Sequence, residues 1–204
     1  MRISEGFIYA LVALSRHDSI PADMDIYAPV LGDWEITGTE YLANPPKPVK
    51  MQVSFSRVLD GRAIQDIWSW AIDPSLPATG ANYASGTTFR VYDPEERVWH
   101  VTWIDPVKRA CVQLDARKVG TDIVQLGAKA TGEPRRWIFS EMTQDSFTWR
   151  GEGSEDGGTT WRLYAEYYAR RRSQEQSAQQ AQHHQQDREQ GEHDADQDAQ
   201  HEQP

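Results

Sequence analysis

From residue 34 to residue 170 the chain consists of short strand-like segments, with turn residues between them and no helix-like stretch. Asp60-Gly61 and Asp93-Pro94 are two of these turns. Short segments separated in this way are typical of strands joined by hairpins in an antiparallel sheet. Closing such a sheet removes its two exposed edges, so a barrel is favoured over an open sheet. We therefore predict an all-β protein, an antiparallel up-and-down barrel of about ten strands, over residues 34–42, 49–59, 62–72, 85–93, 97–105, 110–118, 121–129, 134–142, 146–153 and 159–170.

The first clear hairpin turns at Asp60-Gly61, a dipeptide preferred in two-residue type I′ turns. This turn pairs Leu59 with Arg62, and every further pair follows by counting away from it. The bulky apolar residues of both strands, Trp68 among them, then share one face, which becomes the inside of the barrel. The register was counted from the turn alone, so the gathering of the apolar residues on one face supports it independently.

Two more hairpins extend the same inner face. One is predicted around residues 93–97, with a three-residue loop, and one turns at residues 156–158 and pairs Glu152 with Arg162 on the outer face. The first of these registers places Val91 opposite Trp99, Phe89 opposite Val101 and Thr87 opposite Trp103 inside, and Arg90 opposite His100 outside. Together the registers indicate an aromatic lumen, whose candidate ligand contacts are Trp68, Trp70, Trp99, Trp103 and Trp149.

Two charged residues, Arg57 and Asp66, fall on this predicted inner face. They are diagonal neighbours across their hairpin, within reach of a long side chain. An isolated charge inside a barrel is unfavourable, so we expect them to form a structural ion pair near the barrel mouth. A functional interpretation also stays open, in which Asp66 is a general base or Arg57 binds a ligand carboxylate.

Several short motifs occur in the order of one known family. They are Leu31-Gly32-Asp33-Trp34, then Arg90-Val91-Tyr92-Asp93-Pro94 leading to Trp99 and Trp103, then Phe147-Thr148-Trp149 before Ser154-Glu155-Asp156-Gly157-Gly158-Thr159-Thr160-Trp161, and last Tyr167-Tyr168-Ala169-Arg170. Through these motifs, residues 27–172 resemble a bacterial lipocalin-like family of unknown function. The resemblance implies a calycin-type barrel with a lumen, and it implies no assigned chemistry.

The resemblance also implies structural roles for three residues at the closed end of the barrel. Gly32 would let the backbone pass close, and Trp34 would plug the end. A basic residue on the last strand would stack over this tryptophan, and Arg170 is the best-placed candidate. A cation over an indole contributes about 0.5–2 kcal/mol. The alternative is that Arg170 is an exposed member of the Arg-Arg-Arg run.

The sequence contains few residues suited to metal or nucleophilic chemistry. His100 is the only histidine in the barrel segment, and the register turns it outward, whereas a haem-binding barrel needs an inward histidine. We find no Ser-His-Asp arrangement, no glycine-rich phosphate loop and no Cys-x-x-Cys motif. The single cysteine, Cys111, cannot form an internal disulfide, and its strand context predicts a small buried hydrophobe. We therefore predict no metal and no cofactor.

The two ends of the chain differ from the barrel segment. Residues 3–15 have an amphipathic helical pattern and are expected to cap an open barrel end; packing on a partner or lack of order are the alternatives. A short helical turn is expected over residues 24–30. Residues 173–204 contain 11 Gln, 4 His and eight acidic residues, a composition typical of disorder. The predicted organisation is a helix and linker over 1–22, a barrel over 23–172 and a disordered tail over 173–204.

The charge is concentrated in the tail. Of the formal charge of −10, −7 falls on residues 173–204 and −3 on residues 1–172. The nearly neutral barrel segment offers little attraction for nucleic acid or an anionic membrane. The apolar stretch 7–14 is too short for a membrane span and is a poor signal peptide, so we expect a cytoplasmic location. The oligomeric state stays open, with a homodimer as one option.

Three functions are compatible with this sequence. The leading hypothesis is a barrel that binds a small, partly apolar molecule among its inward tryptophans. The alternative is an enzyme of the same fold, an isomerase, cyclase or hydrolase that acts on a hydrophobic substrate with Asp66 and Arg57 as polar lumen groups. The third is an interaction scaffold whose lumen is filled by aromatic side chains. A lumen of useful volume separates the first two from the third, and the position of Asp66 separates the first from the second.

Overall fold

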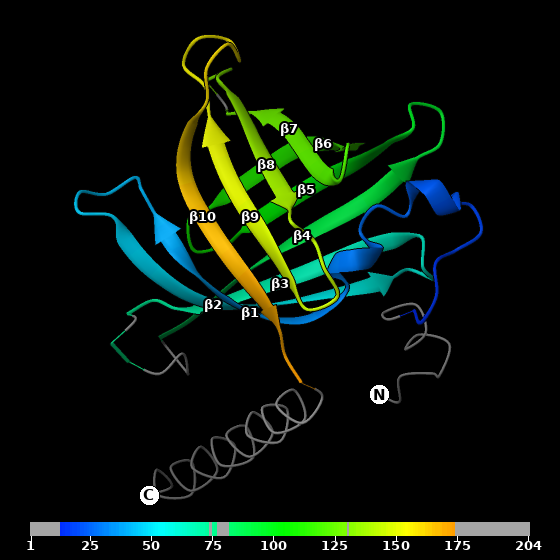
Figure 1. Ribbon diagram of the computed structural model, residues 1–204, viewed down its shortest axis with the longest axis horizontal. Coiled ribbons are helices and arrows are strands. Elements are labelled where there is room, and N and C mark those ends of the chain that lie inside the picture. The colour runs from blue at the N-terminus through cyan, green and yellow to red at the C-terminus, as the bar shows by residue number, and fades with distance from the viewer. Residues whose placement is uncertain (1–12, 74, 77–81, 130, 174–204) are drawn as a thin grey trace, which may run out of the picture. The chain divides into compact units, whose positions relative to one another are not determined.

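The computed structural model describes residues 13–73, 75–76, 82–129 and 131–173, and in them ten antiparallel strands close into one barrel (Figure 1). Consecutive strands pair, and β1 pairs with β10 to complete the closure. The predicted ten-stranded, all-β barrel is thus confirmed. Two 3-10 turns, η1 (Ala22–Met24) and η2 (Ala28–Val30), precede the strands. The strands are β1 (Gly32–Glu40), β2 (Lys47–Val58), β3 (Ala63–Ala71), β4 (Tyr83–Asp93), β5 (Val98–Asp105), β6 (Ala110–Val119), β7 (Asp122–Ala128), β8 (Pro134–Ser140), β9 (Ser146–Gly153) and β10 (Arg162–Arg171).

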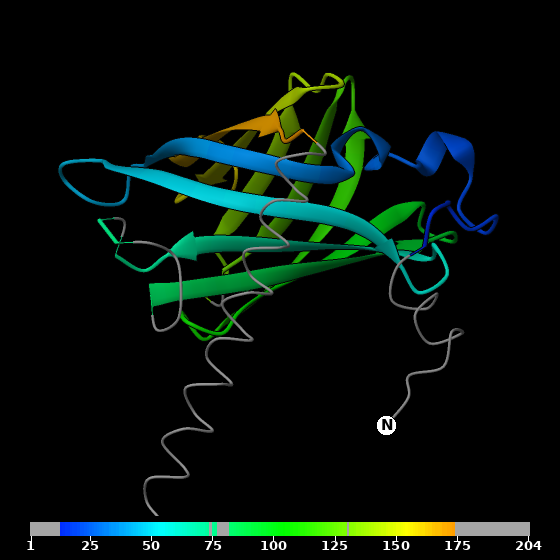
Figure 2. The ribbon, with the colours of Figure 1, turned by 90° about the horizontal axis from the view of Figure 1, so that it is seen from below.

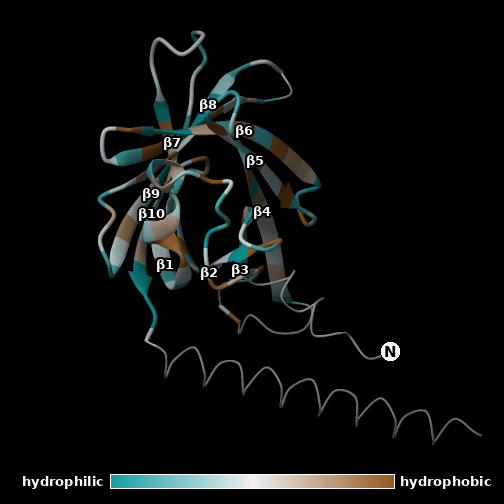
Figure 3. Cartoon of the chain, turned by 90° about the vertical axis from the view of Figure 1, so that its right-hand side faces the viewer, coloured by the Kyte–Doolittle hydropathy of each residue, from teal (hydrophilic) through white to brown (hydrophobic). Residues whose placement is uncertain are grey.

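Side chains alternate between the inside and the outside of the barrel, as the two-residue period of a strand requires. Figure 3 shows this alternation as hydrophobic and hydrophilic bands along the strands. On β2, Val53 and Phe55 are buried in the core. The register predicted from the Asp60-Gly61 turn is confirmed, because Val53 pairs with Trp68. A local turn therefore decided which face of β2 and β3 became the interior.

The two ends of the barrel differ (Figures 1 and 2). η1 and η2 lie at one end, and the loop between β1 and β2 lies at the other. At the first end Trp34 is fully buried, and its Nε1 donates a hydrogen bond of 2.8 Å to the carbonyl oxygen of Val30. The ring of Trp34 packs edge-on against Phe147, with 4.8 Å between the ring centroids. Side chains therefore close this end.

The cation over Trp34 is supplied by Arg171, so the assignment to Arg170 is wrong. The Cζ atom of Arg171 lies 4.0 Å from the centroid of the Trp34 ring, whereas Arg170 is exposed. The reason is the alternation along β10, which turns Ala169 and Arg171 to the inner side and Arg170 outward. Gly32 has a φ of +107°, and a Cβ added there would lie 2.6 Å from Nη1 of Arg171. Glycine at this position thus leaves room for the stacked guanidinium.

The segment before β1 packs on the closed end. The helical turn expected over residues 24–30 is instead two separate 3-10 turns. Between them, Asp25 forms an ion pair of 2.7 Å with Arg57. The backbone carbonyl of Met24 accepts a hydrogen bond of 2.8 Å from Nε1 of Trp99. Both contacts join this segment to strands that are distant in the sequence.

The helix predicted over residues 3–15 lies mostly outside the described residues, which begin at 13. At its end, Ala13 forms an antiparallel bridge with Arg57, and the side chain of Leu14 is 99% exposed. Residues 13–15 therefore do not belong to a helix that packs on the barrel.

The predicted register of β4 and β5 is wrong by one residue. Tyr92 pairs with Trp99, because Arg97 adopts a φ of 51° and joins the turn, which makes the loop four residues long. A shift of one residue turns a whole strand over. Val91, Phe89 and Thr87 therefore lie on the outer face of β4, and Arg90 lies inside and is 2% exposed. Trp99 and Trp103 keep their predicted inward orientation, because the error falls entirely on β4.

The last hairpin also differs from its predicted register. Glu152 pairs with Leu163 rather than with Arg162, and a bulge follows between Leu163 and Ala165. The carboxylate of Glu152 forms its ion pair with Arg136 of β8. A further correction concerns Cys111, which is exposed on the outer face of β6 and is not a buried hydrophobe.

Candidate functional site

The barrel contains a cavity of about 390 Å³. Its rim includes Lys47 after the β1–β2 loop, Ile72 after β3 and Lys108 between β5 and β6. These connections lie at the end of the barrel opposite η1 and η2, so the cavity opens there and is closed at the Trp34 end. The aromatic residues of the wall are Trp68, Trp70, Trp103, Trp137, Phe139, Trp149, Tyr164 and Tyr167.

The aromatic side chains of the wall pack against one another in a fixed arrangement. Trp149 and Tyr167 are stacked, with 4.8 Å between centroids and 11° between the planes. Trp149 also contacts Trp68 at 6.2 Å and Trp137 at 5.8 Å, and Trp137 contacts Trp103 edge-on at 6.5 Å. Rings held at these separations attract one another beyond simple area burial. They form a rigid apolar wall against which a flat or elongated molecule could pack.

Four of the five tryptophans selected from the sequence lie in this wall: Trp68, Trp70, Trp103 and Trp149. Trp99 does not line the cavity. It is 1% exposed and packs at the closed end, where its ring meets Tyr27 edge-on at 5.4 Å. Trp137 was missed because no hairpin register was derived for β8. Its two-residue spacing from the buried Phe139 was the available signal.

The predicted ion pair between Arg57 and Asp66 does not form. Nη2 of Arg90 lies 2.7 Å from Oδ2 of Asp66, and Arg57 binds Asp25 at the closed end. The corrected register of β4 explains this, because Asp66 faces Thr88 directly and Arg90 diagonally. The other carboxylate oxygen of Asp66 accepts a 2.9 Å hydrogen bond from the backbone N–H of Thr88. Both carboxylate oxygens of Asp66 therefore face groups of β4.

Arg90 retains its charge inside the barrel. Burial is the largest single effect on the guanidinium and lowers its pKa, but Asp66 and Tyr27 together outweigh burial and raise the pKa of Arg90 above its usual value. The Cζ atom of Arg90 also lies 4.8 Å from the centroid of the Tyr27 ring and 5.4 Å from that of Phe55. Burial raises the pKa of the Tyr27 hydroxyl to about 12, although Arg90 opposes this effect. Arg90 thus belongs to the cavity lining, and its charged guanidinium is held in a fixed position between Tyr27, Phe55 and Asp66.

Gln125 supplies a second polar group to the cavity wall. Its side chain is fully buried, and neither Nε2 nor Oε1 has a hydrogen-bond partner within the described part of the chain. A buried amide without a partner costs about 1–3 kcal/mol. The residue belongs to the cavity lining, so the unpaired amide lies beside the cavity.

Basic residues outnumber acidic ones in the cavity lining. Both acidic side chains already have protein partners: Asp105 accepts from the backbone N–H of Lys108 at 2.8 Å, and Glu40 accepts from the hydroxyl of Tyr167 at 3.1 Å. Burial, followed by the proximity of Glu40, raises the pKa of Tyr167. The basic residues of the lining are Lys47, Lys50, Arg90, Lys108 and Arg135, although the Lys50 side chain itself lies on the exposed outer face of β2.

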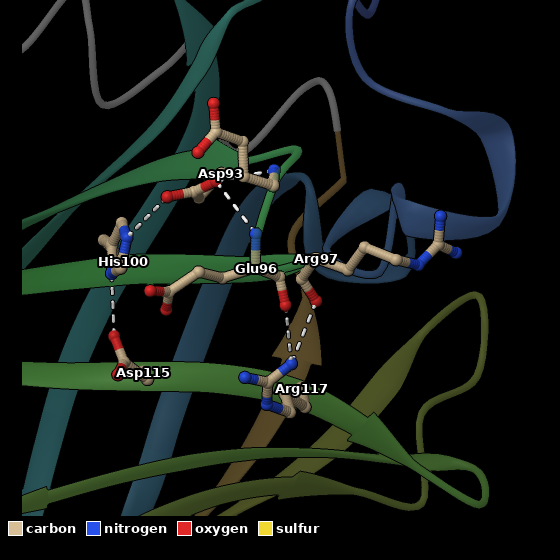
Figure 4. Close-up of polar contacts among 7 residues, drawn as sticks. Asp93, Glu96, Arg97, His100, Asp115 and Arg117 are labelled. Atoms are coloured by element: carbon tan, nitrogen blue, oxygen red, sulfur yellow. Dashed lines mark hydrogen bonds and ion pairs between the residues drawn. The ribbon is translucent and has the colours of Figure 1, made fainter.

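His100 lies on the outer face, as its register predicted, and takes no part in the cavity (Figure 4). Its Nδ1 atom is 2.8 Å from Oδ1 of Asp115 on β6, and its Nε2 atom is 3.4 Å from Oδ2 of Asp93 on β4. The hydrogen bond to Asp115 is the main cause that raises the pKa of His100 above 6.5; burial is the next largest effect and opposes it. This cluster links three neighbouring strands on the outside of the barrel.

Comparison with known proteins supports the fold only. No protein family and no curated protein matches the sequence. Among solved structures, the chain is similar to the S-type phycobiliprotein lyase CPES from Guillardia theta, with a TM-score of 0.50 and 12% sequence identity over 73% of this chain and 92% of that one. At this identity the likeness shows a shared barrel architecture. In the described residues, no helix is both long and apolar enough to cross a membrane.

Proposed function

We propose that this protein binds a small, partly apolar molecule in the cavity of the barrel. One observation carries the proposal, namely the 390 Å³ cavity with its wall of packed aromatic rings. Ligand pockets of proteins span roughly 300–1,000 Å³ and are lined mainly by apolar and aromatic side chains with a few polar groups. A filled scaffold would leave no such space. The architecture shared with a phycobiliprotein lyase is compatible with this function and does not identify the ligand.

The enzyme alternative has less support from the geometry. It assigned roles to Asp66 and Arg57, and both are held in ion pairs by other residues, Arg90 and Asp25. Neither Asp66 nor Arg57 belongs to the cavity lining among the described residues. A general base must reach the proton that it removes. We therefore prefer binding over catalysis.

The proposal is tested with a neutral aromatic probe, N-phenyl-1-naphthylamine, titrated into the protein while tryptophan emission and probe fluorescence are recorded. We expect saturable binding to the wild-type protein. Val112→Trp should abolish it, because Val112 lines the cavity opposite Trp103 and the added ring fills the space. Cys111→Trp is the matched control. Cys111 is the neighbour of Val112 in the chain and points to the outside of the barrel, so the added ring should leave probe binding unchanged. Binding that survives Val112→Trp would place the probe outside the cavity and contradict the proposal.

Two tryptophans of β5 provide an independent comparison. Trp103 lines the cavity, whereas Trp99 is buried at the closed end. Trp103→Ala should weaken probe binding by about 1–3 kcal/mol, the scale of one buried side chain's contacts. Trp99→Phe should mainly lower the unfolding midpoint, because phenylalanine cannot donate the hydrogen bond that Trp99 makes to the carbonyl oxygen of Met24. If both changes reduced probe affinity equally, the assignment of Trp103 to the binding site and of Trp99 to the closed end would be contradicted.

A further inference from the structure

We infer that the ligand of this cavity carries an oxyanion, such as a carboxylate, which binds Arg90 and Gln125 while the aromatic wall holds its apolar body. The inference rests on the proposed function and names the chemical class of ligand. It comes from Arg90 and Gln125, two almost fully buried side chains of the cavity lining that carry polar atoms without a hydrogen-bond partner among the described residues.

Arg90 offers more hydrogen-bond donors than the protein uses. Its guanidinium has five N–H groups, of which Nη2 serves the ion pair with Asp66. Nε and Nη1 make no well-oriented hydrogen bond within the described residues, although the Tyr27 hydroxyl interacts with the guanidinium and helps to raise the pKa of Arg90. The rings of Tyr27 and Phe55 and the carboxylate of Asp66 together hold the group in place. A guanidinium with spare donors and a fixed orientation is well suited to a planar oxyanion.

Gln125 adds both a donor and an acceptor. Nε2 can donate to an oxyanion, while Oε1 requires an N–H or O–H from the ligand. A residue with only a packing role at this fully buried position would be better replaced by leucine, which has no amide to leave unpaired. Both side chains can donate to an oxyanion, and Gln125 in addition calls for an N–H or O–H group on the ligand.

The charge of the lining supports the same conclusion. The four other basic residues, Lys47, Lys50, Lys108 and Arg135, also line the cavity, while residues 1–172 as a whole carry a net charge of −3. The two acidic residues of the lining accept hydrogen bonds from neutral groups, namely the backbone N–H of Lys108 and the hydroxyl of Tyr167, so the five basic residues of the lining exceed the acidic ones by three. Positive charge is therefore concentrated at the cavity in an otherwise acidic segment, which favours the entry of an anion.

The test compares two probes that share one aromatic body. 8-Anilinonaphthalene-1-sulfonate carries a sulfonate next to its anilino N–H, and N-phenyl-1-naphthylamine lacks only the sulfonate. We expect the wild-type protein to bind the sulfonate probe at least about tenfold more tightly, which corresponds to the gain of one charge-assisted hydrogen bond. Val112→Trp should abolish the binding of both probes.

Two variants assign this preference to named residues. Gln125→Leu should lower the ratio of sulfonate to neutral affinity about tenfold and raise the unfolding temperature, because it removes an unpaired buried amide. Gln113→Leu, a change of an exposed glutamine on β6, should alter neither quantity. Arg90→Met combined with Asp66→Asn should abolish the preference, because it removes both members of the ion pair and leaves no unpaired charge.

The outcomes separate the two proposals. If neither probe binds, or Val112→Trp leaves binding intact, the proposed function fails. If the neutral probe binds in the cavity and the sulfonate probe binds no more tightly, the oxyanion inference is overturned and the proposed function stands. If the preference exists but persists in both Gln125→Leu and the double variant, the anion is bound at the rim lysines, and the assignment to Arg90 and Gln125 is overturned.

Discussion

At the scale of single residues, Arg171 connects the first and last strands of the barrel. Its guanidinium covers the ring of Trp34 and donates from Nη1 to the carbonyl oxygen of Leu31 at 2.7 Å. Nη2 reaches the carbonyl oxygen of Pro29 at 3.3 Å, and Nε donates to that of Gln144. One side chain thus satisfies three backbone carbonyls and stacks on an indole at the seam where the sheet closes.

The prediction at this scale contrasts two neighbouring arginines. Arg171→Ala should lower the free energy of unfolding by about 2–3 kcal/mol, because it removes a cation–π contact and charge-assisted hydrogen bonds. Arg170→Ala should change it by less than about 0.5 kcal/mol, as expected for an exposed side chain. Chemical denaturation of both variants measures the difference. Equal losses would mean that the stacking over Trp34 adds nothing to stability.

At the scale of elements, the 3-10 segment and the β2 strand are joined by a mostly buried ion pair. The side chains of Arg57 and Asp25 are 8% and 15% exposed, and they lie 2.7 Å apart. Two residues earlier, Asp23 forms a similar ion pair of 3.0 Å with Arg97, but on the surface. The two pairs differ mainly in burial, so they provide a matched comparison.

We expect Asp25→Ala to destabilise the protein by about 3 kcal/mol, because it leaves the Arg57 charge buried without its partner. Asp23→Ala should cost less than about 1 kcal/mol, since the exposed pair is screened by water. Asp25→Ala combined with Arg57→Met should recover part of the lost stability. Urea denaturation of the four proteins measures these differences, and a double variant no more stable than Asp25→Ala would contradict the account.

A second element-scale prediction concerns pH, because His100 joins β4, β5 and β6 through Asp93 and Asp115 (Figure 4). The folded protein raises the pKa of His100 above the 6.5 of an unperturbed histidine. The cluster therefore stabilises the fold fully at pH below the unfolded value, and this contribution is lost as pH rises through the folded pKa. The free energy of unfolding should therefore decrease less steeply above about pH 6.5 in His100→Gln than in the wild-type protein. If wild type and variant lose stability in parallel, the cluster contributes nothing measurable.

At the scale of the whole molecule, the chain combines an aromatic-rich barrel with a polar, acidic C-terminal segment. Residues 173–204 contain no Phe, Tyr or Trp and no aliphatic side chain larger than alanine except the proline at 204, and residues 174–204 lie outside the described part of the structure. From this composition we predict that the segment has too little apolar surface to compensate the entropy lost on ordering.

Truncation after Arg172 should therefore leave the unfolding midpoint of the barrel unchanged within experimental error. Differential scanning calorimetry of the full chain and the truncated chain measures this. A drop of several degrees would instead show that the tail packs against the barrel. The same pair of proteins shows whether the tail alters the affinity for the anionic probe, since it carries a charge of −7.

The sequence by itself determined the architecture of this protein. Turn chemistry and the two-residue period are local properties, so the ten strands, their closure into a barrel and the register around Asp60-Gly61 could be read from it. The same period identified four tryptophans of the cavity wall, since an apolar residue on the inner face of a barrel strand must meet the lumen or the core.

Only the tertiary structure decided which polar groups meet inside. One extra turn residue, Arg97 with a positive φ, moved Arg90 from the outer face to the lumen and gave Asp66 its partner. The ion pair of Arg57 depends on Asp25, which reaches it from a separate segment. Such contacts depend on the length of a loop and on where distant segments cross. A single-residue shift inverts a strand, and neither composition nor periodicity specifies that residue.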